Sequence, residues 1–307
     1  MRAVAIVIAA LAALALAAVA LNRLGLMRLR NRAHRAAARE GSFAGGRAVS
    51  VTDDLIVLAP LGGATDGPAV LLVHAWGVPD PAAYRGLIEH LLKRGMVVRF
   101  PLYQRRFTPH PITRRLRAIL DRGAPEWRQD TILAVGHSAG ATGLLDLVVA
   151  EHGNTALRHV FLASPGDGTD AEGKAASTSL ALLKWGGAPA PSAQPAPPAF
   201  TLISSDGDAL TGHATADRMN EYLRTIGWGG SARRVRLPVG DGCGTHFWPL
   251  GGDPTYRLSP VTRAFAKTDA LGGGASWECD AVDWAFWAMI DDAAHDDAAR
   301  VPPSMAQ

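Results

Sequence analysis

Hydrophobic and polar positions follow two different periods along most of the chain. Short continuous apolar runs predict buried strands, and the run at 69–73, AVLLV, is the clearest of them. Between these runs apolar side chains recur at helical spacing, as they do across 81–94. The pattern predicts strands within 49–59 and at 69–73, 96–100, 131–135, 159–163, 200–204 and 233–237, and helices at 81–94, 112–120, 139–150, 211–225 and 280–291. Such alternation favours an α/β fold with a doubly wound, mostly parallel sheet.

The beginning of the chain does not follow this pattern. Residues 3–21 contain no charged or strongly polar side chain. As a helix they would be about 28 Å long, close to the roughly 30 Å of a bilayer's hydrocarbon core. A helix on the surface of a soluble domain would show a polar stripe, and this segment has none. We therefore expect one N-terminal transmembrane helix.

The sequence around this segment predicts whether it is cleaved or retained, and how it is oriented in the membrane. Ala18-Val19-Ala20 has the shape of a signal-peptidase site, so cleavage is the alternative to retention. However, only Arg2 precedes the apolar run, whereas six arginines follow it within the first 40 residues. Under the positive-inside rule they hold the downstream side in the cytoplasm, which favours a retained anchor and a cytoplasmic domain. The same arginines either contact anionic headgroups or only set this topology.

The chain divides into an N-terminal anchor, a linker, one domain and a tail. We expect the anchor at 1–22, a basic stem or linker at 23–46, a single α/β domain at 47–292 and a flexible tail at 293–307. The proline-rich stretch at 186–199 cannot be a helix or a central strand, so it is a loop. It is not a domain boundary, because the strand that follows it is needed to complete the sheet.

Charge and cysteine content exclude several functions. The formal net charge of the 307 residues is +3. Residues 1–40 hold seven arginines and one glutamate, a net charge of +6, so the remainder carries −3. We expect no nucleic-acid partner, since such a binder would show a basic face on its folded part. Two cysteines, Cys243 and Cys279, exclude a disulfide scaffold and a four-cysteine zinc site, and they would pair only if the domain is exported.

Residues 136–140, GHSAG, match the pattern G-x-S-x-G. They directly follow the strand predicted at 131–135 and open the helix predicted at 139–150. A strand, a sharp turn and a helix form the context in which this pattern marks a nucleophile elbow. Ser138 is therefore the candidate nucleophile, and an ordinary glycine-rich turn is the alternative.

A serine nucleophile needs a base, and the base needs an acid to orient it. Behind an elbow serine the acid and then the histidine follow along the chain. Asp208, after the strand at 200–204, is the candidate acid, and Asp206 is the alternative. His246, in a glycine-rich loop after the last predicted strand, is the candidate base, unless it only packs on its aromatic neighbours.

Residues 74–77, HAWG, follow the strand at 69–73, where hydrolases with this elbow carry the first half of the oxyanion hole. The backbone N–H groups of Trp76 and Ala139 would bind the developing negative charge. Ala75 stands where His-Gly-X-Gly has its first glycine. No residue set suggests a metal or a cofactor.

Together these motifs resemble the α/β-hydrolase superfamily over about 47–292. Within it the chain is similar to the chlorophyllase-like and cutinase-like (polyester hydrolase) serine esterases. The resemblance rests on HAWG at 74–77, RFPLYQ at 99–104, GHSAG at 136–140, SDGDALTG at 205–212 and THFWP at 245–249. It implies hydrolysis of a small-molecule or lipid-like carboxylic ester through an acyl-enzyme, without metal or cofactor. The membrane anchor, Ala75 and the proline-rich loop depart from the family pattern.

Two other functions remain open at the level of sequence. A thioesterase or a peptidase would use the same three residues. A membrane-tethered binding protein that has kept the fold without the activity is the second alternative, although Ser138, Asp208 and His246 in the right order argue against it.

Overall fold

A computed structural model describes residues 35, 43–63, 65, 67–104, 112–167, 196–208, 210–237 and 288–293. Several expectations fall outside this set: the membrane segment at 3–21, most of the proline-rich loop at 186–199, the tail beyond 293, the candidate base His246, Cys243 and Cys279.

One sheet of eight strands forms the centre of the described part of the chain. The strands are β1 (Gly46–Val51), β2 (Leu55–Pro60), β3 (Ala69–Val73), β4 (Val97–Pro101), β5 (Thr131–His137), β6 (His159–Ala163), β7 (Ala199–Ser205) and β8 (Ala232–Leu237). Their order is β1-β2-β4-β3-β5-β6-β7-β8. β2 is antiparallel to both neighbours, and the strands from β4 to β8 are parallel. This is the strand order of the α/β-hydrolase fold, so the predicted fold class is confirmed for the sheet.

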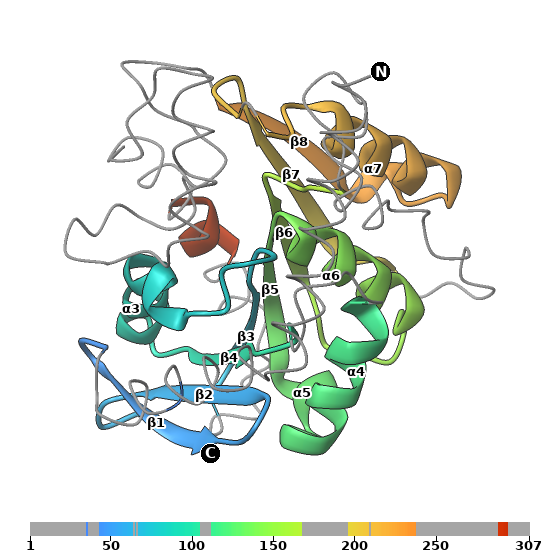
Figure 1. The fold of residues 1–307 in the computed structure, drawn as a ribbon. Coiled ribbons are helices and arrows are strands. Elements are labelled where there is room, and N and C mark those ends of the chain that lie inside the picture. Colours follow the sequence, from blue (N-terminus) through green and yellow to red (C-terminus); the bar gives the residue numbers. More distant parts are fainter. Residues whose placement is uncertain are drawn as a thin grey trace, which may run out of the picture.

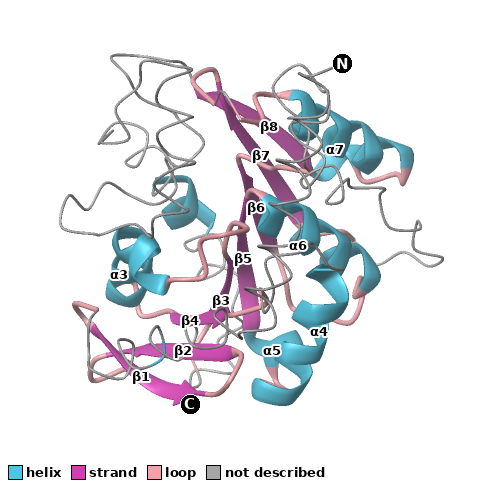
Figure 2. Cartoon of the chain, in the orientation of Figure 1, coloured by secondary structure: helices cyan, strands magenta, loops and turns pink. Residues whose placement is uncertain are grey.

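Helices cover both faces of this sheet. On one face lie η1 (Pro81–Tyr84), α3 (Arg85–Lys93) and the helical residues 288–293. On the other lie α4 (Ile112–Gly123), α6 (Ala139–Ala150) and α7 (Ala214–Thr225) (Figure 1). The short α5 (Trp127–Asp130) and η3 (Gly229–Ser231) lead into β5 and β8. Figure 2 shows the helix–sheet–helix layers that result.

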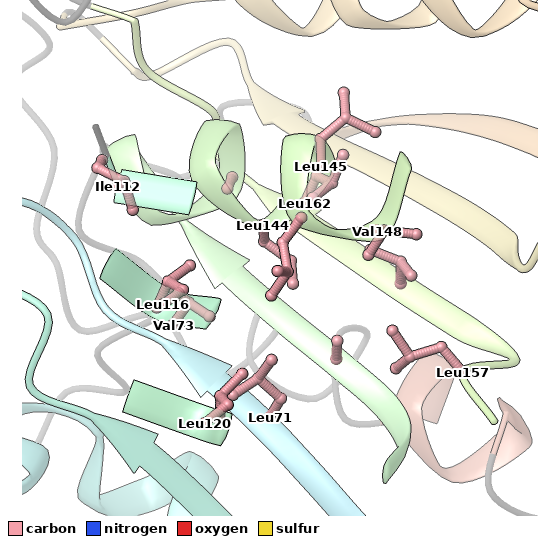
Figure 3. Packing of buried hydrophobic residues seen from close by; sticks show 14 of the residues in the cluster. Leu71, Val73, Ile112, Leu116, Leu120, Leu144, Leu145, Val148, Leu157 and Leu162 are labelled. Atoms are coloured by element: carbon pink, nitrogen blue, oxygen red, sulfur yellow. The ribbon is translucent and has the colours of Figure 1, made fainter. Parts of the chain in front are cut away.

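Each face of the sheet has its own apolar core. In β3, Val70 and Leu72 belong to the core under α3, whereas Leu71 and Val73 belong to the core under α4 and α6. Successive side chains of a strand point to opposite faces, so a strand buried on both sides must be apolar throughout. Figure 3 shows the second core, where β3 faces α4 and α6 through leucine and valine side chains (Leu71, Val73, Leu116, Leu120, Leu144, Val148).

Several elements differ in their bounds from the prediction. The helix expected at 81–94 consists of η1 followed by α3, and helical residues continue to 293 beyond the expected end at 291. The helix expected at 211–225 begins only at Ala214. The reason is local, since the Asp208 carboxylate accepts hydrogen bonds from the N–H groups of Leu210 and Thr211 and holds them in a turn.

Helices long and apolar enough to cross a membrane do not occur among the described residues. The segment at 3–21 lies outside that part of the chain. The transmembrane anchor therefore stays a prediction.

Candidate active site

Ser138 occupies the turn between β5 and α6, at the carboxyl edge of the sheet. Its backbone has φ 56° and ψ −125°, a region that residues other than glycine rarely adopt. Its N–H donates to the carbonyl oxygen of Ala163, the last residue of β6, at 3.0 Å. Its side chain is only partly buried. This is the strand–turn–helix geometry that the motif at 136–140 predicts for a nucleophile elbow.

The two glycines of the motif are required by close packing. A Cβ on Gly136 would lie 2.6 Å from the Cα of Ala141. A Cβ on Gly140 would lie 2.5 Å from the carbonyl oxygen of Val73 and closer still to that of His74. The start of α6 therefore packs directly on the end of β3, which brings Ala139 next to the loop that follows β3.

That loop is held by side-chain hydrogen bonds on both sides of Trp76. The N–H of Ala75 donates to the Tyr84 hydroxyl at 2.8 Å, and the N–H of Gly77 donates to Oε1 of Gln104 at 2.6 Å. Both acceptor side chains are fully buried. These bonds fix the backbone path through Trp76, whose N–H is one of the two expected oxyanion donors, although Ala75 replaces the usual glycine.

Asp208, the expected acid, is buried just beyond β7. Its Oδ1 accepts from the N–H groups of Leu210 and Thr211, at 3.0 and 2.9 Å. Its Oδ2 accepts from the Thr211 hydroxyl at 2.7 Å. Three hydrogen bonds from its own turn therefore orient the carboxylate.

The turn after β6 connects this acid to the serine. A Cβ on Gly166 would lie 3.1 Å from Ser138 Oγ and 3.0 Å from Cγ2 of Thr211. The serine hydroxyl and the turn that orients Asp208 therefore border the same glycine. The structure thus brings Ser138 and the Asp208 turn together at one edge of the sheet.

Asp206, the alternative acid, has other partners. It is more exposed than Asp208, and it pairs with Arg236 of β8 and with Nε2 of His213, the latter at 2.8 Å. Nδ1 of His213 lies 2.6 Å from the hydroxyl oxygen of the fully buried Ser204. Asp206, His213 and Ser204 thus form a hydrogen-bonded chain, which joins β7 to the start of α7. The hydrogen bond from Arg236 lowers the pKa of Asp206 against the effect of burial, and His213 lowers it further.

Some residues at this edge could not be assigned from the sequence. Ser164 has a positive φ of 42°. Asp167 is buried, and it accepts from the Thr215 hydroxyl at 3.0 Å and pairs with Arg218 at 2.6 Å. From the sequence, 164–167 are only the residues that follow the strand predicted at 159–163. Tyr84 lay within a predicted helix, and Gln104 ends the run RFPLYQ. The sequence indicated no hydrogen-bond partner for either side chain.

The expected triad also includes a base. His246 is not among the described residues, so its place relative to Ser138 and Asp208 stays a prediction. Within the described ranges, no three His, Cys, Asp or Glu side chains are grouped so that they could hold a metal ion.

Comparisons with known proteins give similarity in fold. No protein-family model matches the sequence, and no curated protein matches it. Esterase B from Lactobacillus rhamnosis, whose structure includes a tributyrin phosphonate inhibitor, is 15% identical with a TM-score of 0.50, over 84% of this chain and 96% of that one. Carboxylesterase CesB from Bacillus subtilis is 13% identical with a TM-score of 0.45, over 80% and 99%. At 15% identity the similarity to esterase B concerns the fold alone, and it agrees with the strand order.

Proposed function

We propose that this chain is a serine hydrolase that cleaves carboxylic esters through an acyl-enzyme. Ser138 attacks the acyl carbonyl while His246 takes its proton and Asp208 fixes the imidazole tautomer. The N–H groups of Trp76 and Ala139 bind the tetrahedral oxyanion, and water then repeats the attack on the acyl-enzyme. The observation that carries this proposal is the backbone of Ser138, held at φ 56° between β5 and α6.

His246 enters the proposal through chain order. The acid follows β7, and His246 comes nine residues after Leu237, the last residue of β8. In α/β-hydrolases the base follows the acid along the chain, and parallel strands bring their carboxyl ends to one edge. Both arguments favour His246 as the partner of Asp208.

The substrate class is proposed from the motifs and from the fold. HAWG at 74–77, SDGDALTG at 205–212 and THFWP at 245–249 favour the chlorophyllase-like and cutinase-like branch, which acts on lipid-like and polyester substrates. The similar fold of esterase B, solved with a phosphonate related to a triglyceride, supports an uncharged carboxylic ester. We therefore propose a small-molecule or lipid-like ester as the substrate.

A panel of p-nitrophenyl esters of graded chain length tests this function. We expect hydrolysis by the purified full-length chain and a loss of about a thousandfold or more in Ser138→Ala. The same panel includes acyl thioesters and peptide p-nitroanilides. Turnover of thioesters alone would make the enzyme a thioesterase, and turnover of p-nitroanilides alone would make it a peptidase. Turnover that does not depend on Ser138 would contradict the mechanism.

We also propose that residues 3–21 anchor the enzyme in a membrane, with the domain on the cytoplasmic side. The apolar length of this segment and the arginines that follow it support the proposal. Arg35, a described residue of the stem, donates to the carbonyl oxygen of Asp53 in the β1–β2 turn at 2.7 Å. The full-length chain should stay in membranes washed with alkaline carbonate, and protease added outside intact cells should not cleave it. Release by carbonate would contradict the anchor, and cleavage from outside would contradict the orientation.

A further inference from the structure

One buried hydroxyl connects the two segments that carry the proposed oxyanion donors. The hydroxyl oxygen of Tyr84, the last residue of η1, lies 2.8 Å from the N of Ala75 and 3.0 Å from Nδ1 of His137. Ala75 directly precedes Trp76, and His137 directly precedes Ser138. The Tyr84 side chain therefore joins the loop after β3 to the nucleophile elbow.

We propose that Tyr84 is a positioning residue, which sets the separation of the Trp76 and Ala139 N–H groups through these two hydrogen bonds. This inference rests on the proposed esterase function. It adds a role for a residue that makes no contact with substrate in the mechanism above.

The Tyr84 hydroxyl lies where the pairing of β3 and β5 ends. The two strands are paired up to Val73 and Gly136, and beyond that pair one chain enters a loop and the other enters the elbow. Backbone N–H groups that leave a sheet need new partners when they are buried. The Tyr84 hydroxyl supplies one for Ala75 and at the same time reaches the elbow, so it extends the connection between β3 and β5 past the end of their ladder.

The Tyr84 hydroxyl can serve both partners at once, because it has one proton and two lone pairs. Its oxygen accepts from the N–H of Ala75, and it shares its second hydrogen bond with Nδ1 of His137, whose tautomer sets the direction of that bond. Burial raises the pKa of Tyr84 far above its ordinary value of 10.0, against the lowering effect of the Ala75 N–H, so the hydroxyl keeps this proton at any working pH. Tyr84 itself therefore does not ionise over the range in which esterases work.

The hydroxyl has a function that the ring alone would not explain. The Tyr84 ring packs in the core near Phe100 and edge-on to His137, contacts that a phenylalanine would keep. Removing the oxygen would leave the N–H of Ala75 and Nδ1 of His137, both buried, without this partner. Donors 1 Å out of place lose much of their effect on a developing oxyanion, whereas they alter substrate binding less.

Steady-state kinetics of Tyr84→Phe test the inference. With the p-nitrophenyl ester that the wild type prefers, we expect kcat to fall about 10- to 100-fold while KM changes less than about threefold. Tyr103→Phe is the matched control, because the Tyr103 hydroxyl is also buried and donates to the carbonyl oxygen of His74 at 2.9 Å, next to Ala75. Its kcat should stay within about threefold of wild type, although both variants lose a buried hydrogen bond and stability.

A second pair of variants probes the elbow side, should Tyr84→Phe not fold. His137→Asn keeps an amide that can donate or accept near the position of Nδ1 and should retain most of kcat, whereas His137→Leu should lose as much as Tyr84→Phe. Equal kcat values in His137→Asn and His137→Leu, or in Tyr84→Phe and Tyr103→Phe, would overturn the inference and leave the esterase function standing. A wild type without Ser138-dependent hydrolysis would overturn both.

Discussion

The backbone of Ser138 is the residue-scale feature on which the proposed chemistry depends. A φ of 56° in a non-glycine residue is strained, and strain of this kind costs about 1–3 kcal/mol. The hydrogen bond from its N–H to Ala163 and the packing of Gly136 and Gly140 hold the turn in this conformation. Stability is thus given up at the position where the nucleophile is needed.

This strain predicts that a glycine at position 138 stabilises the fold. Ser138→Gly should have a free energy of unfolding about 1 kcal/mol higher than Ser138→Ala, because glycine adopts a positive φ without steric cost and alanine does not. Both variants lack the hydroxyl, so alanine is the matched control. Urea denaturation of the two proteins measures the difference. Equal stabilities would mean that the turn is not strained at this residue.

The two aspartates after β7 should differ sharply in their effect on rate. Asp208 is buried and oriented toward its own turn beside Ser138, so Asp208→Ala should lower kcat about a thousandfold or more. Asp206 is already paired with Arg236 and His213, so Asp206→Asn should keep kcat within about fivefold. Initial rates on one ester compare the two variants. The opposite ranking would make Asp206 the acid.

Asp206 should instead influence stability as a function of pH. Arg236 lowers its pKa below the ordinary value of 3.8, so the folded state binds fewer protons than the unfolded state. The stabilisation is then present above the unfolded pKa and disappears as the pH falls through the lower folded value. The Tm of the wild type should exceed that of Asp206→Asn near neutral pH, and the gap should close below pH 3.8. Thermal melts across this range measure it, and a gap independent of pH would contradict the pairing.

At the scale of elements, the site depends on how closely α6 packs against β3. Gly140 has no room for a side chain, since a Cβ would overlap the carbonyl oxygens of Val73 and His74. Gly140→Ala should therefore push the elbow away from the loop after β3 and lower both stability and kcat. Gly230→Ala is the control, because a Cβ there would have no atom within 4 Å. Circular-dichroism melts and ester turnover measure both variants, and a Gly140→Ala protein that matches Gly230→Ala would refute the close packing.

The elements themselves were largely predictable from the sequence, because local patterns specify them. The apolar run AVLLV gives β3, and the glycines around Ser138 give the elbow between β5 and α6. The start of α7 at Ala214 was not predictable in the same way. Its helical pattern extends back to 211, but the Asp208 carboxylate holds those residues in a turn.

At the scale of the whole molecule, contacts between residues far apart in the chain could not be predicted from the sequence. Tyr84 and His137 are 53 residues apart, and Asp167 and Arg218 are 51 apart. Nothing local marks either pair, although each lies beside the proposed site. The contacts of Asp206 with His213 and Arg236 were not predictable from the sequence either. Sequence patterns therefore predicted the turn at Ser138 more completely than the side chains that hold the surrounding loops.

Positive charge is concentrated in the N-terminal segment of the chain. The first 40 residues carry +6 and the remainder −3, so the basic character belongs to the proposed anchor and stem. In the α/β domain most described arginines pair with acids, as the buried Arg99 does with Asp130 and Arg117 of α4 with Glu151, which follows α6.

The central claim is that Ser138 is an activated nucleophile. Labelling of the full-length chain with a fluorophosphonate, followed by mass spectrometry of the digested protein, tests it most directly. We predict one phosphonyl adduct per chain on Ser138, with labelling abolished in Ser138→Ala and slowed severely in Asp208→Ala. An unlabelled wild type, or an adduct on another serine such as Ser204, would contradict the account.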